Sequence, residues 1–296
     1  MVGAGNDFLI VDAVHERVSA LKAAWPAVAR AMCERRDGIG ADGLLILEAS
    51  RKADCRMRIF NPDGSEAEMC GNGARCVASY LASSVQRAAF RTTKQVSIET
   101  AGGLVAAQVR GNRVRMAMPQ PRDLKLGLHI QVDGRLWPLG YVDTGVPHAV
   151  AVVRQVDEVN VMQIGRRLRF HPAFHPRGTN VDFIEISRAN PDRLKIRTYE
   201  RGVEGETPAC GTGVAAAAVI YALTRSNGRH AARANRARAH RIAVQTRSGE
   251  TLTVSLRVAA DPNGVRVSDV ILEGAVRWVC QGYVPWRVRE GVIAWP

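Results

Sequence analysis

Two cysteines stand in the same local sequence, at position 70 in EMCGNGARC and at position 210 in PACGTGVAA. Each is followed by Gly-x-Gly and then by alanine-rich sequence, which favours a helix that begins at the motif. A helix start presents unpaired backbone N–H groups and a partial positive charge, and both stabilise a thiolate. We therefore predict that Cys70 and Cys210 open two helices and that each thiol ionises partly near neutral pH.

The same helix starts suit an anionic ligand. Glycines allow a ligand to approach the backbone closely, and the exposed N–H groups hold a carboxylate. The residues predicted to form such a carboxylate cradle are Gly71, Asn72, Gly211 and Thr212.

Two activated thiols in matched settings favour a chemistry different from that of one nucleophile. A thiolate on one face of a carbon removes a proton, and a thiol on the opposite face returns one, which inverts the stereocentre. The other interpretations of these cysteines are a disulfide or metal site at Cys70 and Cys76, and an oxidised, inactive disulfide between Cys70 and Cys210. Because the spacing lacks a second Cys/His cluster, we predict no metal. The other four cysteines, Cys33, Cys55, Cys76 and Cys280, are predicted to be core or surface thiols.

Short apolar runs bounded by Gly, Pro, Asn or Asp predict many strands, with a few helices between them. The predicted strands are 8–13, 43–49, 56–61, 96–101, 104–110, 113–119, 148–153, 180–187, 193–200, 241–247 and 251–258. The predicted helices are 19–35, 73–87, 161–169 and 211–224.

The two halves of the chain resemble each other. Residues 70–82 (CGNGARCVASYLA) align with residues 210–222 (CGTGVAAAAVIYA), and strands are predicted on both sides of each stretch. We interpret this as a duplication, with chance similarity of two Gly-rich turns as the alternative. The predicted domains are residues 1–118, completed by a C-terminal strand at 273–296, and residues 119–272.

Composition limits the class of protein. The chain has 296 residues, of which 46% are hydrophobic, so it can bury a sizeable core. No apolar run reaches the roughly 18 residues of a membrane helix, and no secretory signal is visible, so we expect no membrane contact. Six cysteines are too few for a disulfide framework, and we expect reduced thiols in the cytoplasm.

The net charge is +13, and most of the basic excess is arginine. We interpret this as genome base composition rather than as a nucleic-acid site, and we expect no nucleic-acid partner. The arginine-rich stretch 225–241 is predicted to be an exposed loop or a solvated helix, with an RNA or membrane-surface contact as the alternative.

At these motifs the sequence resembles the diaminopimelate epimerase family, whose members are cofactor-independent amino-acid epimerases. The matching stretches follow in family order: GNDFLIVD (5–12), GIGADGLL (38–45), FNPDGSEAEMCGNGARC (60–76), PHAV (147–150), GTNVDF (178–183) and YERGVEGETPACGTG (199–213). The resemblance implies an α/β protein of the α+β type with two similar domains. Each would be a curved, mostly antiparallel sheet wrapped around a central helix, with the active site in the interdomain cleft. It also implies a homodimer and no cofactor.

The resemblance further implies roles for individual residues. In one direction Cys70 is similar to the proton donor and Cys210 to the acceptor, and His148 and Glu200 are similar to a pair that tunes their protonation. Substrate-contacting positions are matched by Asn6, Asn61, Asn180, Glu200 and Arg201, and the carboxylate cradle by Gly71, Asn72, Gly211 and Thr212.

Each role suits the residue type, but each also has a structural alternative. Asparagine offers a donor and an acceptor to a zwitterion without adding charge, and Arg201 can grip a distal carboxylate with two hydrogen bonds. Glu200 can receive an α-ammonium. Instead, Asn6 and Asn61 could cap turns, His148 could be a satisfied buried histidine, and Arg201 could form a surface ion pair.

Four departures from the family pattern concern the first strand and the distal end of the substrate. Only MV precedes GAGNDF, where family members usually have a strand, so we expect a chain that lacks this first strand or starts late. Val146 stands where many family members have Asn, and Gly43 stands where some have Gln. The stretch ERGVEGET is one residue longer than the shorter family form. These changes predict altered recognition of the distal end rather than altered proton chemistry.

The function predicted from sequence is epimerisation of LL-diaminopimelate to the meso form, a step of lysine and peptidoglycan biosynthesis. A close alternative is a racemase of histidine, glutamate or proline on the same two-thiol plan. From other classes, the alternatives are a basic RNA-binding protein and a thiol hydrolase that uses Cys210 and His148. No lysine stands in a recognisable Schiff-base context, so pyridoxal phosphate is not expected.

Overall fold

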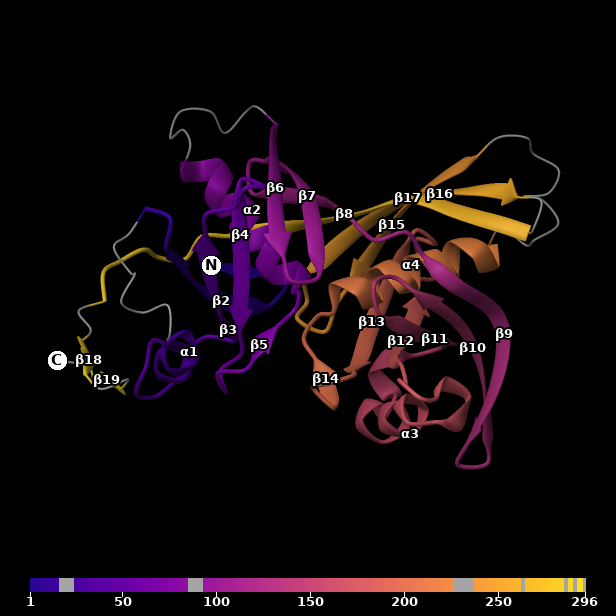
Figure 1. Ribbon diagram of the computed structural model, residues 1–296. Coiled ribbons are helices and arrows are strands. Elements are labelled where there is room, and N and C mark those ends of the chain that lie inside the picture. Colours follow the sequence, from indigo (N-terminus) through magenta and orange to yellow (C-terminus); the bar gives the residue numbers. More distant parts are fainter. Residues whose placement is uncertain are drawn as a thin grey trace. The chain divides into compact units, whose positions relative to one another are not determined.

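The computed structural model describes residues 1–15, 24–84, 93–225, 237–261, 264–284, 287–289 and 292–294. The chain forms two compact units: unit 1 contains Met1–Met116 and Gly274–Pro296, and unit 2 contains Ala117–Glu273. Sequence alone places these boundaries near 118 and 272. Both units are rich in strands and contain few helices (Figure 1), which confirms the α+β class. No helix in the described ranges has the length and apolar character needed to cross a bilayer.

Unit 1 begins with a two-residue strand that the sequence did not predict. This strand, Val2–Gly3, pairs with both the next strand and the last long strand of the chain. The described elements of unit 1 are β1 (Val2–Gly3), β2 (Asn6–Asp12), α1 (Trp25–Cys33), β3 (Gly43–Glu48), β4 (Cys55–Phe60), β5 (Glu66–Ala67), α2 (Gly71–Ser84), β6 (Lys94–Thr100), β7 (Gly103–Arg110), β8 (Arg113–Ala117), β18 (Arg287–Arg289) and β19 (Val292–Ala294).

Unit 2 opens with a long hairpin and contains the second cysteine-headed helix. Its described elements are β9 (Arg122–Val132), β10 (Arg135–Asp143), β11 (Pro147–Val153), η2 (Val156–Glu158), η3 (Val161–Gly165), α3 (Arg166–Arg169), η4 (Pro172–Phe174), β12 (Asn180–Ile186), β13 (Arg193–Glu200), β14 (Gly205–Thr207), α4 (Gly211–Arg225), β15 (Arg238–Gln245), β16 (Thr251–Asp261) and β17 (Gly264–Arg277). The last residues of β17, from Gly274, belong to unit 1.

The two units repeat one order of strand pairing. In unit 1 the pairs are β1–β2 antiparallel, β2–β3 parallel, β3–β4 antiparallel, β4–β6 parallel, and β6–β7 and β7–β8 antiparallel. In unit 2 they are β10–β11 antiparallel, β11–β12 parallel, β12–β13 antiparallel, β13–β15 parallel, and β15–β16 and β16–β17 antiparallel. The prediction of two similar domains is therefore confirmed.

In each unit the cysteine motif leads into a helix that lies in the core. All residues of α4 from Gly213 to Leu223 are buried, and a helix that is apolar on every side must be surrounded by other elements. This helix packs against β10–β13, β15 and β16, as Figure 1 shows. The corresponding helix α2 is buried from Asn72 to Ala78 and packs against β1, β2, β4, β6 and β7.

The sequence missed the β9–β10 hairpin and most of β17. Strand β9 alternates apolar residues with polar residues or glycine (Leu124, Leu126, Leu128, Ile130 and Val132), a signal that sequence reasoning missed, although the strand is mostly exposed and contains Gly127 at a φ of 70°. Strand β10 contains Pro138, which is unusual within a strand. The predicted helix at 161–169 is a π-helical turn followed by one α-turn. Parts of three other predictions lie outside the described residues: 19–23, 85–87 and 226–236. So do several positions of the predicted C-terminal strand.

Candidate active site

Cys70 lies directly before helix α2, half-buried, as the motif predicts. Its sulfur accepts a hydrogen bond from the backbone N–H of Gly73 at 3.4 Å. A Cβ built on Gly71 would meet no atom within 4 Å, so a ligand can reach the backbone at this helix start. The geometry has the two features that the sequence argument required, namely an N–H aimed at the sulfur and open space beside it.

Next to Cys70, three amide and guanidinium groups form a polarised chain that ends on a carboxylate. The Arg75 guanidinium donates to Asn72 Oδ1 at 2.8 Å, and Asn72 Nδ2 donates to Asn6 Oδ1 at 2.6 Å. The amide of Asn6 then donates to Asp42 Oδ2 at 3.0 Å. Because a cation donates at one end and a carboxylate accepts at the other, the orientation of both amides is fixed. The structure thus brings the predicted residues Asn6 and Asn72 together.

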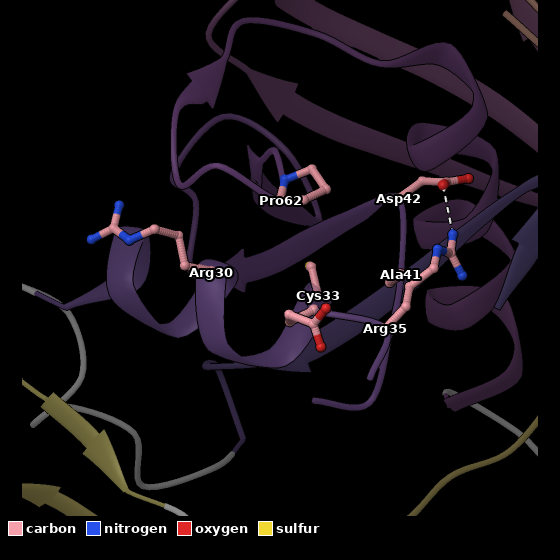
Figure 2. A pocket seen from close by; sticks show the side chains of 7 residues that line it. Arg30, Cys33, Arg35, Ala41, Asp42 and Pro62 are labelled. Carbon is pink, nitrogen blue, oxygen red and sulfur yellow. Dashed lines mark hydrogen bonds and ion pairs between the residues drawn. The ribbon is translucent and has the colours of Figure 1, made fainter. Parts of the chain in front are cut away.

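The carboxylate end of this chain is held by Arg35, which sequence reasoning missed. Its guanidinium donates to both oxygens of Asp7, at 3.0 and 2.8 Å, and to Asp42 Oδ1 at 2.7 Å. Hydrogen bonding to Arg35 lowers the pKa of the Asp7 carboxyl. Figure 2 shows Arg35 and Asp42 on one side of a pocket of about 400 Å³ beside α1. Cys70 does not line this pocket, so we assign the pocket no part in the thiol chemistry.

Asn61 is exposed and engaged in its own turn. Its side-chain amide donates to Ser65 Oγ at 3.0 Å, and its backbone N–H donates to the Ser65 carbonyl at 2.8 Å. This is the turn-capping arrangement that stood as the structural alternative for this residue. Asn61 is exposed enough to contact a substrate, but its described hydrogen bonds are all made within its own turn.

Cys210 lies directly before helix α4 and is buried, with 8% of its surface exposed. Burial raises its pKa well above the usual thiol range, and the nearby Glu200 and Asp182 carboxylates raise it further. Hydrogen bonds from Thr212 and from the Gly213 backbone act in the opposite direction but are smaller. The prediction that Cys210 ionises partly near neutral pH is therefore wrong for this form of the protein. The helix start is present, but desolvation outweighs it.

His148 is completely buried on β11 and connects to Cys210 through Thr212. Its Nδ1 lies 2.7 Å from Asp182 Oδ2, and its Nε2 lies 2.9 Å from Thr212 Oγ1. The same Thr212 oxygen lies 3.3 Å from the Cys210 sulfur. His148 is thus a satisfied buried histidine, as the structural alternative held, and it is also hydrogen-bonded toward a predicted catalytic group.

Asp182 and Thr198 support His148, and sequence reasoning missed both. Thr198 Oγ1 donates to Asp182 Oδ1 at 2.7 Å, and both side chains are buried. A signal was available, because Asp182 interrupts the apolar strand NVDFIEI, and a buried aspartate needs partners. The carboxylate also explains why position 213 is glycine. A Cβ there would stand 2.5 Å from Asp182 Oδ1.

The remaining predicted residues meet at the ends of β12 and β13. Asn180 Nδ2 donates to the Pro147 carbonyl at 2.9 Å, and Asn180 Oδ1 accepts from the Arg201 backbone N–H at 2.8 Å. The guanidinium of Arg201 donates to the Arg177 carbonyl at 3.4 Å. Burial raises the pKa of the Glu200 carboxyl, so this group holds its proton more strongly than an exposed glutamate.

The two substituted positions, Val146 and Gly43, can both be placed. Val146 is half-buried, in the turn that also contains Thr144. The Thr144 hydroxyl donates to the Thr212 carbonyl at 2.9 Å, so this turn contacts the start of α4. Gly43 is buried at the start of β3, and a Cβ there would lie 3.2 Å from the Phe60 carbonyl.

Comparison with known proteins gives consistent results over nearly the whole chain. The sequence model described as diaminopimelate epimerase matches residues 1–122 and 140–267. The diaminopimelate epimerase of Chlorobaculum tepidum is 39% identical over 293 residues, covering 96% of this chain and 99% of that protein. That of Aquifex aeolicus is 36% identical, with 97% of each chain covered, and that of Moorella thermoacetica is 42% identical over 77% of this chain and 84% of its own.

Solved structures share the fold at much lower identity. A hydroxyproline epimerase from Agrobacterium vitis gives a TM-score of 0.62 at 18% identity, covering 93% of this chain and 87% of that one. A phenazine biosynthesis protein of the PhzF family from Bacillus anthracis gives 0.63 at 17% identity, covering 93% and 92%. These likenesses concern the fold alone and do not favour the racemase alternative.

Proposed function

Because this chain belongs to the diaminopimelate epimerase family, we propose that it interconverts LL- and meso-diaminopimelate with two cysteines and no cofactor. One thiolate removes the α-proton from one face of the substrate carbon, and the other thiol delivers a proton to the opposite face. The observation that carries this proposal is the repetition of one site in two units. Each unit places a cysteine at the entrance of its buried helix, beside the backbone N–H of the second motif glycine.

We assign the residues as follows, on the basis of the family motifs and their contacts. The helix starts hold the α-carboxylate and stabilise the carbanion-like transition state through preorganised N–H groups. Arg201 binds the distal carboxylate, and Glu200 and the asparagines bind the ammonium groups and fix the orientation. The proposed catalytic residues are Cys70 and Cys210, with His148 and Glu200 tuning their protonation. The proposed binding residues are Asn6, Asn61, Asn180, Glu200 and Arg201, with Gly71, Asn72, Gly211 and Thr212 at the carboxylate.

The raised pKa of Cys210 assigns its resting state. Burial holds it as the thiol, which is the proton-donating form. In the direction in which Cys210 must instead remove a proton, its own proton has to leave first.

Hydrogen exchange tests the proposed function directly. The purified protein is incubated in heavy water with LL-diaminopimelate, meso-diaminopimelate, glutamate, histidine or proline, and deuterium at the α-carbon is followed by NMR. We expect exchange and inversion with both diaminopimelate isomers only. Exchange with one of the other amino acids, and none with diaminopimelate, would favour the racemase alternative and overturn this assignment.

We further propose that the protein acts in the cytoplasm as a homodimer, as the family resemblance implies. A reducing compartment suits a mechanism that needs two thiols. Sedimentation velocity at several concentrations tests the assembly, and a monomer throughout the range would contradict it.

A further inference from the structure

The turn that carries Arg201, between β13 and β14, is held by a carboxylate of its own. Glu204 Oε1 accepts a hydrogen bond from the Gly202 backbone N–H at 3.0 Å, and the Glu204 backbone N–H donates to the Glu200 carbonyl at 2.8 Å. Glu204 has a φ of 55°, a left-handed conformation that is uncommon for residues other than glycine. A glutamate kept in such a conformation points to a function of its carboxylate.

The same oxygen of Glu204 is bound by Arg169, at the end of α3. Arg169 Nε and Nη2 lie 3.2 and 3.0 Å from Glu204 Oε1, and only 13% of the Arg169 side chain is exposed. Gly178, in the stretch GTNVDF, makes room for this arginine, because a Cβ there would collide with Nη1 and stand 2.6 Å from the Arg169 carbonyl. A guanidinium so little exposed needs an anionic partner, and Glu204 supplies it.

One carbonyl oxygen connects this ion pair to Arg201. The Arg177 carbonyl accepts hydrogen bonds from Arg169 Nη1 at 3.3 Å and from Arg201 Nη1 at 3.4 Å. These residues come from α3, from the segment before β12 and from the turn between β13 and β14 (Figure 1). Within the described part of the chain, Glu204 forms an ion pair with Arg169, whereas Arg201 forms none. The carboxylate is thus on one of two neighbouring guanidinium groups, and the other is left for a ligand.

We propose that Arg169 is a positioning residue that keeps the carboxylate of Glu204 away from Arg201. Bound to Arg169, this carboxylate holds the turn and leaves the Arg201 guanidinium available for an anionic group of the ligand. Without Arg169, Arg201 is the remaining cation on the shared carbonyl oxygen, so Glu204 pairs with it and competes with the ligand. The Glu204 side chain is 34% exposed, which gives it room to make this change. This inference deepens the proposed function and rests on its assignment of Arg201 to the distal carboxylate.

Chemical modification of Arg201 tests the proposal without substrate. Phenylglyoxal reacts more slowly with an arginine that is paired to a carboxylate, and peptide mass spectrometry gives the modification rate of Arg201 alone. We expect Arg169→Met to lower this rate by about two- to fivefold, the scale of a partly exposed ion pair. Adding Glu204→Gln to Arg169→Met removes the competing charge and should return the rate to the wild-type value.

The same variants separate this competition from a purely structural role of the ion pair. Arg169→Met should raise the KM for diaminopimelate by about two- to fivefold, with kcat within about twofold of wild type, because binding rather than the chemical step is affected. The double variant should restore KM. Glu204→Gln alone keeps an oxygen for Arg169 and for the Gly202 N–H, and it should leave KM unchanged. If the ion pair only held the turn, both single variants would raise KM and the double variant would not restore it.

The matched control is Arg197→Met in the same hairpin. Arg197 is 12% exposed on β13, and its Nε donates to Glu206 Oε1 on β14 at 2.7 Å. This change removes an arginine of similar burial that is paired with a neighbouring glutamate and that has no described contact with Arg201. It should leave both the modification rate of Arg201 and the KM at their wild-type values.

An Arg201 modification rate that Arg169→Met leaves unchanged overturns the proposal, as does a double variant that stays as slow as Arg169→Met. If Arg169→Met fails to fold, which circular dichroism would reveal, Glu204→Gln alone decides. A rise in KM or a slower modification of Arg201 in that variant would show that the carboxylate assists Arg201, which contradicts the competition. The modification assay needs no substrate, so a wild-type protein that fails to exchange diaminopimelate refutes the proposed function and leaves the pairing of Glu204 to be decided by the modification rates.

Discussion

The two cysteine-headed helices begin over surfaces of opposite polarity, although their units share one order of strands. Below the start of α2, a Cβ on Gly73 would lie 3.1 Å from Leu45 Cδ2, so the helix faces a leucine side chain. Below the start of α4, the same construction on Gly213 meets the Asp182 carboxylate at 2.5 Å. The two units share one strand order, but the residues that pack against the two helix starts differ.

The strand registers show that these are equivalent positions and not merely neighbours of the same motif. In each unit a parallel pair of strands, β2–β3 or β11–β12, supplies one residue from each strand. The third residue comes from β4 or β13, the antiparallel neighbour, and lies opposite the residue of the second strand. These positions are Phe8, Leu45 and Ile59 in unit 1, and His148, Asp182 and Thr198 in unit 2. The first set belongs to the apolar core of unit 1, and the second is a buried hydrogen-bonded cluster at the start of α4.

The polar groups of unit 1 lie elsewhere: the Arg75 guanidinium is buried, and the carboxylate end is partly exposed. Its amide chain from Arg75 through Asn72 and Asn6 ends at Asp42, which Arg35 holds at a partly exposed edge. In unit 2 the charged carboxylate is directly below the helix start. In the described contacts, the side chains of Asn72 and Arg75 lie at the start of α2, whereas a carboxylate and an imidazole lie at the start of α4. The two thiols lie at equivalent helix starts but have different polar neighbours.

The largest effect is expected when either sulfur is removed. Cys70→Ala and Cys210→Ala should each reduce epimerisation by about 10²- to 10⁴-fold or more, because each removes a general acid–base group. Cys280→Ala, which changes an exposed cysteine, is the control and should leave turnover unchanged. The measurement is inversion of LL-diaminopimelate followed by NMR. Near-normal turnover without Cys70 would point to the thiol hydrolase scheme, in which Cys210 and His148 suffice.

The sequence predicted both helix starts and most of the strands, because Cys-Gly-x-Gly and short β-branched runs are local signals. It did not reveal that Asp182 lies beneath Gly213, since that contact depends on the pairing of β11 with β12 and on the depth at which α4 sits. For the same reason it misjudged Cys210. A helix dipole can be read from sequence, but the desolvation that opposes it is a property of the packed core. Hairpin β9–β10 was missed although β9 alternates apolar and polar residues; Gly127 and Pro138 within its strands argue against strand formation.

Placing an aspartate in unit 1 at the position equivalent to Asp182 should lower the free energy of unfolding substantially. Leu45→Asp places a carboxylate in a fully buried site whose equivalents of His148 and Thr198 are Phe8 and Ile59. We expect a loss of about 3–5 kcal/mol in the free energy of unfolding, the range for an uncompensated buried charge. Leu45→Met should cost less than about 1.5 kcal/mol. Urea denaturation measures both, and a charge tolerated within about 1 kcal/mol would show that the apolar surface beneath α2 is not closed.

A smaller contrast is expected between the second glycines of the two motifs. Gly213→Ala drives a methyl group against a fixed carboxylate, and such overpacking typically costs about 1–3 kcal/mol. Gly73→Ala meets the far end of a flexible leucine, and alanine is favoured over glycine within a helix by about 1 kcal/mol, which offsets the contact. Thermal and urea unfolding of the pair should therefore separate them, with Gly213→Ala less stable. Equal losses would mean that Asp182 moves aside readily and that its carboxylate is not held fixed beneath Gly213.

The smallest effect concerns the exposed charges of unit 1 and depends on pH. Arg35 hydrogen-bonds Asp7 and lowers its pKa below the ordinary value of 3.8. A carboxyl with a depressed folded-state pKa adds stability above its unfolded pKa and loses this contribution as the pH falls through the folded value. Arg35→Met should therefore lower the free energy of unfolding at pH 7 by less than about 1 kcal/mol, since the pair is partly exposed. The deficit should shrink as the pH falls below the ordinary carboxyl pKa of 3.8 and Asp7 takes up its proton. Arg51→Met, which removes an exposed arginine from the same unit, controls for net charge. Equal deficits for Arg35→Met at both pH values would show that Arg35 contributes through packing, and that the carboxylate end of the amide chain is not held electrostatically.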